Sequence, residues 1–218
     1  MLVTNMYLIG TLSVPSTWIA LIIAFIVTYT VIRIRRGKYL AEVLSDAFFF
    51  FIIVWKLSVV VTDFSTVLKS PISIIYFNGG ILGFYLGLLV AGARIAIEIR
   101  NKNLPNLKIA ILFAGVVTVQ AIYQLMMVFL NEGGLVAQIM TISIFTLFSL
   151  FVWMNIEKLG NWPIQLAIMF LAVHLFAAAF QDEGITGTPV IATIGSALFF
   201  AVAFSVRQGT EVESEVRL

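Results

Sequence analysis

The stretch AFFFFIIVWKLSVVV, residues 47–61, decides the fold of this chain. It is apolar apart from Lys56 and Ser58, and the hydrophobic segment around it extends over residues 44–62. A helix of that length crosses a hydrocarbon core of about 30 Å. An ammonium group inside such a helix is costly to keep in lipid, so Lys56 marks a candidate functional site.

The composition of the whole chain also indicates a membrane protein. The 218 residues are 61% hydrophobic and 11% charged, and their mean hydropathy is +1.07, far from the values of soluble domains. Transmembrane strands would be shorter and would alternate in polarity, so helices are expected. We predict an all-α integral membrane protein with seven transmembrane helices in one domain, residues 1–206, and a polar cytoplasmic tail, residues 207–218. The predicted helices are 16–34, 44–62, 73–97, 107–130, 135–156, 163–181 and 189–206.

The basic residues predict the orientation of these helices. Eleven of the thirteen Lys and Arg residues, all except Lys56 and Lys69, fall on one side of the predicted membrane domain. By the positive-inside rule that side is cytoplasmic, which places the N-terminus outside and the C-terminus inside. Basic clusters on membrane proteins contact lipid headgroups. We therefore expect no nucleic-acid partner.

Cysteine is absent from the chain, which excludes disulfides and thiol nucleophiles. The single histidine, His174, has no second histidine or carboxylate at the spacing of a metal site. We expect neither a metal nor another cofactor.

Five polar residues fall at one predicted depth in the outer half of the membrane. Lys56, Gln124 and His174 each precede the outer end of a predicted helix by six or seven residues, which is about 10 Å at about 1.5 Å per residue. Asn78 lies in the first turns of the third helix from the outside, and Glu132 directly follows the fourth helix. Together these side chains can line one cavity. In it Lys56 would hold an anionic phosphate, while the amides and the carboxylate would bind hydroxyl groups.

Each of these residues also has a simpler interpretation, which the sequence leaves open. Lys56 can extend its long side chain to the outer headgroups. His174 can be a neutral core histidine bonded to a backbone carbonyl or to Gln124. Gln120 and Gln124, one turn apart, can join helices by hydrogen bonds, and Glu132 can be a solvated loop residue.

The third predicted helix is rich in glycine. Gly83 and Gly87 form a small-xxx-small spacing that lets another helix or a lipid tail approach closely. Gly79 and Gly80, which follow Asn78, stand at the helix entrance, where backbone N–H groups can face a ligand. Helix packing and ligand binding are both open at these glycines.

The residues from Trp18 to Glu132 resemble the bacterial prolipoprotein diacylglyceryl transferases. In that family an arginine-rich loop ends the first helix, the second helix carries a basic residue, and a proline-containing connection precedes a histidine-glycine-glycine run. Here WKLSVVVTDF, SPISIIYF and NGGILGFYLG follow in that order, and YQLMMVFLNE occupies the family signature. Glu132 lies eight positions after Gln124, as the family's glutamate follows its arginine.

The resemblance covers nearly the whole chain. Gln138 matches the glutamine of the family's proline-serine-glutamine segment, and His174 falls on an arginine of the family. The family's fold implies seven helices with the N-terminus outside and the C-terminus inside, in the bacterial cytoplasmic membrane. It also implies a phospholipid such as phosphatidylglycerol as the bound molecule.

The departures from the family pattern fall at its functional positions. The family histidine implicated in catalysis is Asn78 here, its signature arginine is Gln124, and a later arginine is His174. The glutamate that follows the proline-serine-glutamine segment is Thr141. Glu132 keeps the family residue type.

The resemblance leads to three hypotheses. In the first, the protein is a pseudoenzyme or accessory subunit that binds an anionic phospholipid or a lipidated peptide, and it has a membrane or lipoprotein partner. Lys56, Asn78, Gly79, Gly80, Gln124 and Gln138 would then bind lipid. In the second, Lys56, Glu132 and His174 form a different acid/base set in an active lipid-modifying transferase, with Glu132 and His174 as its catalytic residues. The third hypothesis is a small transporter subunit.

Overall fold

The computed structural model describes residues 5–10, 12–70, 79–158 and 162–216. The chain divides into two compact units. Unit 1 comprises Met1–Ala41 and Pro105–Leu218, and unit 2 comprises Glu42–Leu104.

Unit 1 begins with a short β-hairpin, which the sequence did not lead us to expect. Strands β1 (Met6–Ile9) and β2 (Leu12–Pro15) pair antiparallel, with Met6 opposite Pro15. An isolated hairpin of this size is marginally stable by itself. It is held by the end of helix α7, because Asn5 Nδ2 and Tyr7 Oη both donate to the Leu130 carbonyl oxygen at 2.8 Å.

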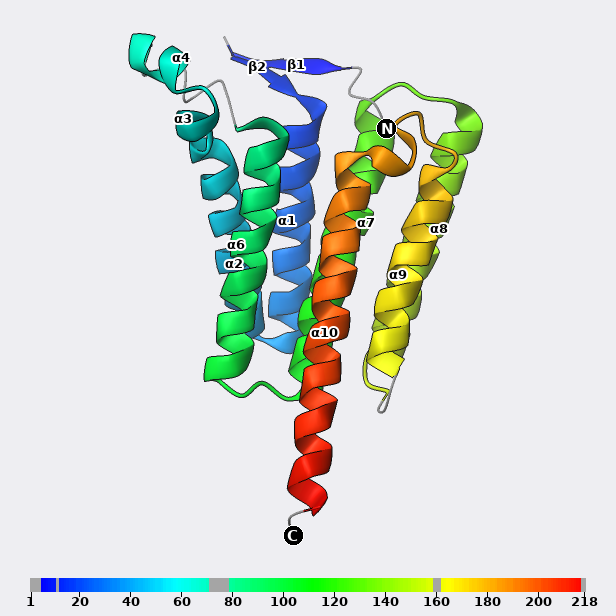
Figure 1. Ribbon diagram of the computed structural model, residues 1–218. Helices are drawn as coiled ribbons and strands as arrows, with labels where there is room; N and C mark the ends of the chain where they lie inside the picture. Colours follow the sequence, from blue (N-terminus) through cyan, green and yellow to red (C-terminus); the bar gives the residue numbers. More distant parts are fainter. Residues whose placement is uncertain (1–4, 11, 71–78, 159–161, 217–218) are drawn as a thin grey trace. The chain divides into compact units, whose positions relative to one another are not determined.

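The rest of unit 1 is helical, and its helices run along one another (Figure 1). Helix α7 is the most buried of the long apolar helices and packs against α1, α8 and α10. Its buried residues lie all around its axis, which is the pattern of a helix in the middle of a bundle. The helices are α1 (Ser16–Arg36), α7 (Asn106–Leu130), α8 (Leu135–Asn155), α9 (Trp162–Ala178) and α10 (Thr188–Val216), with a 3₁₀ turn η1 (Gly184–Thr186) before α10.

Helices α1 and α7 pack through small side chains on α1. The buried residues of α1 recur every fourth position, so they form one narrow stripe. Small residues in such a stripe let two helix backbones approach closely. Ser16 Oγ donates to Asn131 Oδ1 at 2.7 Å, and Ala20 packs on Met127 and Val128, so the two helices are antiparallel. The stripe consists of Ser16, Ala20, Ala24, Thr28 and Ile32.

Unit 2 is built on two helices joined by shorter segments. Helix α2 (Lys38–Leu57) starts in unit 1 and continues into unit 2, where α3 (Val59–Thr62), α4 (Phe64–Lys69) and α6 (Gly80–Asn101) follow. The described part of the predicted helix 73–97 therefore begins at Gly80, and residues 73–78 lie outside the described residues.

The glycines of α6 form the contact with α2. A Cβ atom on Gly83 would collide with Ser58 Oγ and would lie 3.0 Å from the Trp55 carbonyl oxygen. On Gly87 it would lie 2.9 Å from the carbonyl oxygen of Phe51. Real Cβ atoms are not found so close to backbone oxygens. Of the two interpretations of this spacing, close helix packing is therefore confirmed.

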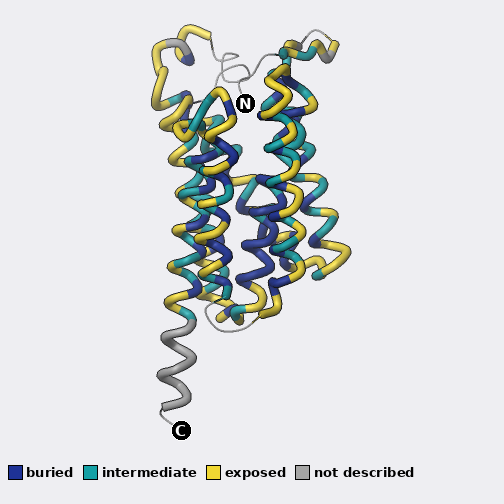
Figure 2. The backbone as a smooth tube through the Cα atoms, turned by 90° about the vertical axis from the view of Figure 1, so that its right-hand side faces the viewer, coloured by how far each residue is buried: buried dark blue, intermediate teal, exposed yellow. Residues whose placement is uncertain are grey.

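Six helices of the described chain are long and apolar enough to cross a membrane. Their exposed residues, yellow in Figure 2, include many large apolar side chains, among them Ile26, Leu89 and Leu147, as expected for surfaces that face lipid. The predicted span 163–181 is the shorter α9, with 17 residues. Helix α10 continues to Val216, so the segment expected as a polar tail after residue 206 is helical as far as that residue. The six spans are Ser16–Arg36, Lys38–Thr62, Gly80–Asn101, Asn106–Leu130, Leu135–Asn155 and Thr188–Arg207.

Candidate functional site

Two of the predicted site residues, Gln124 and His174, contact each other inside unit 1. The Gln124 Nε2 atom on α7 lies 3.1 Å from His174 Nε2 on α9, and His174 Nδ1 lies 2.6 Å from Thr193 Oγ1 on α10. Gln124 and His174 have no exposed surface, and Thr193 is 1% exposed. The interpretation of His174 as a core histidine bonded to Gln124 is thus confirmed, and both of its ring nitrogens are occupied.

This hydrogen-bonded chain continues to α8 and to the connection between α9 and α10. Gln181 Nε2 donates to Gln124 Oε1 at 3.2 Å and to Thr141 Oγ1 at 3.0 Å. Gln181 and Thr141 are both buried. We call the five side chains of Thr141, Gln181, Gln124, His174 and Thr193 the polar chain. It joins all four helices from α7 to α10, so it contributes to the packing of unit 1.

The hydrogen bonds of the polar chain assign the histidine tautomer. Because Gln124 Oε1 accepts from Gln181, its Nε2 group faces His174 and donates to the ring. His174 Nε2 is then the acceptor, and the proton of the neutral ring is on Nδ1, which donates to Thr193 Oγ1. Phe145 packs edge-on against the imidazole, with ring centroids 5.0 Å apart. A neutral, buried and fully bonded imidazole has no lone pair available to a substrate.

The other predicted residues of unit 1 are nearer the surface. Glu132 is exposed in the connection between α7 and α8, and Gln138 is half-buried on α8, where its backbone N–H donates to the Gly134 carbonyl oxygen. The neighbouring Asn131 is buried, and its role was not predicted from the sequence. Its Oδ1 accepts from Ser16 Oγ at 2.7 Å and from the Asn5 N–H at 3.3 Å, so it fastens the N-terminal segment to the end of α7.

In unit 2 the structure joins Gly79 and Gly80 to Trp55, the residue that precedes Lys56. The Gly79 N–H donates to the Trp55 carbonyl oxygen at 3.0 Å, and the Trp55 indole N–H donates to the Gly80 carbonyl oxygen at 3.1 Å. Lys56, the next residue along α2, is half-buried. A Cβ atom on Gly79 would collide with Ser58 Oγ, and Gly80 has a φ of 58°, so both positions require glycine. The predicted partner Asn78 lies outside the described residues.

Lys56 and its glycines belong to unit 2, whereas Gln124, Gln138, Glu132 and His174 belong to unit 1. The expectation that Lys56, Asn78, Gln124, Glu132 and His174 line one cavity therefore stays a prediction. The structure shows two local groups, one in each unit.

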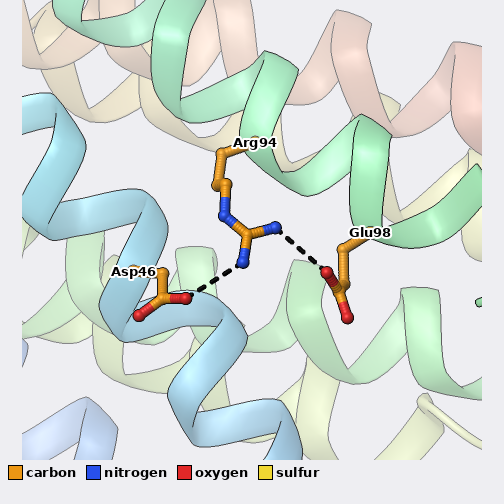
Figure 3. A network of polar contacts seen from close by, with 3 residues as sticks. All are labelled: Asp46, Arg94 and Glu98. Carbon is orange, nitrogen blue, oxygen red and sulfur yellow. Dashed lines mark hydrogen bonds and ion pairs between the residues drawn. The ribbon is translucent and has the colours of Figure 1, made fainter. Parts of the chain in front are cut away.

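A second polar group in unit 2 was missed from the sequence (Figure 3). The Arg94 guanidinium on α6 donates to Glu98 one turn further along the same helix, at 3.0 Å, and to Asp46 on α2, also at 3.0 Å. The Glu98 side chain is 13% exposed and that of Asp46 is 52% exposed. Arg94 lies within the predicted helix 73–97, whereas Glu98 lies one residue beyond its predicted end. The signal that could have found the group is the spacing of Arg94 and Glu98, four residues apart on a helix.

One amide close to the polar chain is not satisfied. Gln120 Nε2 on α7 and Thr28 Oγ1 on α1 are buried and have no hydrogen-bond partner within the described part of the chain. The expectation that both glutamines of α7 join helices by hydrogen bonds is therefore confirmed for Gln124, while the Gln120 amide nitrogen makes no such bond.

Comparison with known proteins adds no relative: no family model, curated protein or solved structure matches this chain.

Proposed function

We propose that the protein is a diacylglyceryl-transferase-like membrane protein that binds an anionic phospholipid and does not catalyse the transfer. In this proposal it acts as a pseudoenzyme or accessory subunit, and its partner is another membrane protein or a lipoprotein. Its location would be the bacterial cytoplasmic membrane, as the resemblance implies.

The observation that carries the proposal is the composition of the polar chain. Three of its members, Gln124, Thr141 and His174, occupy positions where the resemblance implies an arginine, a glutamate and a second arginine. Their side chains belong to one hydrogen-bonded chain. At each of these positions a neutral residue stands in place of the charged one, and it is hydrogen-bonded to another neutral side chain. Such a coordinated replacement is expected when a charged site is converted into a packed core.

The topology belongs to the same proposal. Seven spans require that α9, with 17 residues, crosses the membrane together with the six longer helices, and about 17 residues is the lower end of the spanning range. The cations Arg33, Arg35 and Arg36 in the last turn of α1 support a cytoplasmic end for that helix. The N-terminus would then be outside and the C-terminus inside.

Lys56 is the residue we assign to the lipid phosphate. It is half-buried in the last turn of α2, and the preceding residue Trp55 is hydrogen-bonded to Gly79 and Gly80 at the start of α6. The N-terminus of a long helix attracts anions through its N–H groups and its dipole. An ammonium group and a helix start within one local group suit a phosphate diester.

An active transferase is disfavoured by the burial of its proposed base. His174 has no exposed surface, and both of its nitrogens are bonded to side chains of the polar chain.

A transporter subunit is the second candidate, because the group of Asp46, Arg94 and Glu98 gives α2 and α6 charged residues within the apolar spans. Ionisable residues within spans are characteristic of transport pathways.

The test of lipid binding uses the purified protein in nanodiscs that contain phosphatidylglycerol and phosphatidylcholine. Lys56→Gln is expected to lower the number of retained phosphatidylglycerol molecules, whereas Lys69→Gln, which removes the same charge from exposed α4, is expected to leave it unchanged. Equal effects of the two variants would contradict a site at Lys56.

The test of catalysis uses cells depleted of their authentic diacylglyceryl transferase. We expect no lipidated prolipoprotein when this chain is expressed. Recovery of the lipidated product that is lost again in Glu132→Ala would overturn the pseudoenzyme proposal.

A further inference from the structure

Basic and aromatic side chains meet at one end of unit 1. Helices α1 and α8 end there and α7 and α9 begin there, because α1 and α7 are antiparallel and α7, α8 and α9 are connected in sequence. Among the described residues, five cation–π contacts lie at this end of the unit. They join Arg33 to Tyr29, Arg35 and Arg36 to Trp153, Lys108 to Tyr39, and Lys158 to Trp162.

Trp153 differs from the other aromatic residues because it receives two guanidinium groups. The Cζ atoms of Arg35 and Arg36 lie 5.7 Å and 6.0 Å from the centre of its ring. The indole N–H donates to Thr118 Oγ1 on α7 at 3.0 Å, which fixes the ring. Two neighbouring guanidinium groups on a fixed ring are preorganised, so less side-chain entropy is lost when they bind a ligand.

The charge at this position is positive and only partly balanced. Arg36 pairs with Glu157 at 2.8 Å, and Arg35 is exposed. The two guanidinium groups and the one carboxylate leave a net charge of about +1 beside the indole. Guanidinium groups bind phosphate oxygens through two parallel hydrogen bonds, so the chemistry of the site suits a phosphate.

Two exposed apolar residues indicate what carries that phosphate. Ile34, which precedes Arg35, is 78% exposed, and Met154, which follows Trp153, is 82% exposed. Both lie at the ends of helices that are apolar enough to span a membrane. An occupant with an anionic head and an acyl chain satisfies the arginines and the apolar side chains at once.

We propose that Arg35, Arg36 and Trp153 form a binding site for the headgroup phosphate of an anionic phospholipid. The residues of this site belong to unit 1, whereas Lys56 belongs to unit 2. The ligand is held by guanidinium groups, with the tryptophan ring keeping them in place. Glu157 competes with the phosphate for Arg36.

The chain provides a matched control for this site. Arg33 lies in the same last turn of α1 and is also exposed, but it stacks on Tyr29 and donates to its hydroxyl at 2.8 Å. Arg33→Gln and Arg35→Gln therefore remove equal charge from neighbouring exposed positions. Only the second variant alters the site.

The experiment measures phosphatidylglycerol retained by the purified protein in nanodiscs of phosphatidylglycerol and phosphatidylcholine, by native mass spectrometry. Arg35→Gln is expected to weaken retention about tenfold, as for loss of a charge-assisted hydrogen bond, and Arg33→Gln less than about twofold. Glu157→Gln is expected to strengthen retention because Arg36 is released. Trp153→Leu should weaken it without any change of charge, and Trp153→Phe, which keeps an aromatic ring, should retain more lipid than Trp153→Leu.

Equal losses in Arg33→Gln and Arg35→Gln would overturn the proposal, since they would indicate diffuse attraction to a basic surface. Retention of phosphatidylcholine as strong as that of phosphatidylglycerol would also overturn it. Lys56→Gln is included in the same series to separate the two sites. If the Lys56 site fails, the effect of Arg35→Gln is still expected, and the reverse also holds.

Discussion

The two units hold their helices together in different ways. In unit 1 the buried, neutral polar chain joins the four helices α7, α8, α9 and α10. Its side chains form hydrogen bonds with one another. In unit 2 α2 and α6 meet through glycines at one end and through a partly exposed group of charges at the other. Polar residues in apolar helices therefore have two roles here. The neutral side chains of the polar chain are buried and specify packing, whereas the charged ones are partly exposed.

The largest expected effect comes from breaking the polar chain at its centre. His174→Leu leaves Gln124 and Thr193 buried without their partner, and we expect a loss of about 2–4 kcal/mol in the free energy of unfolding. Denaturant unfolding in detergent measures it. His174→Gln can still accept from Gln124 and donate to Thr193, so it should retain most of the stability. Equal losses in both variants would contradict a role based on these two hydrogen bonds.

The close contact between α2 and α6 in unit 2 is tested by adding a methyl group at a glycine of α6. Gly83→Ala places a Cβ against Ser58 and the Trp55 carbonyl oxygen, and overpacking of this kind costs about 1–3 kcal/mol. The matched control is Gly195→Ala in α10, where a Cβ would meet nothing within 4 Å. That variant is expected to stabilise by about 0.5–1 kcal/mol, because alanine favours helix more than glycine does. Thermal unfolding should therefore shift in opposite directions.

The charged group of unit 2 is expected to matter less than the polar chain. Arg94→Gln removes both ion pairs, but the Asp46 side chain is 52% exposed and can be solvated. Partly exposed ion pairs contribute about 1 kcal/mol or less. The double-mutant cycle of Arg94→Gln and Asp46→Asn measures the coupling. A coupling as large as the His174→Leu effect would remove the distinction between the two units.

The smallest expected effect distinguishes the two glutamines of α7. Gln120→Met removes a buried amide nitrogen that has no hydrogen-bond partner, so it should be neutral or stabilise by up to about 1 kcal/mol. Gln124→Met removes two hydrogen bonds of the polar chain and should destabilise. Melting temperatures of the two variants give the comparison. A clear loss on Gln120→Met would indicate that this amide is satisfied in the folded protein.

The helices of unit 1 could be predicted more completely than their contacts. The predicted segments 107–130 and 135–156 agree closely with α7 and α8, because a long apolar run between turn residues identifies a spanning helix. Hydropathy does not show which polar side chains meet across helices, so the partners Thr193 and Gln181 were not foreseen. The hairpin was missed because its strands are short and depend on Asn131 and Leu130, which lie far away in sequence.

The one-cavity prediction rested on depth alone. Equal depth brought Gln124 and His174 together correctly, since their helices pack in the same unit. It could not indicate that Lys56 belongs to unit 2, together with Trp55 and the α6 glycines. Depth along a helix is readable from sequence, whereas the direction in which a side chain points depends on the neighbouring helix.

The most direct test of the non-catalytic interpretation uses the fact that the chain has one histidine. Labelling with ¹⁵N-histidine gives a nuclear magnetic resonance spectrum of His174 alone, for the protein in nanodiscs near neutral pH. A neutral ring protonated on Nδ1, with nitrogen shifts that do not change when phosphatidylglycerol is added, is the predicted result. A ring protonated on Nε2, or shifts that move with added phosphatidylglycerol, would contradict a sealed polar chain and restore His174 as a candidate catalytic residue.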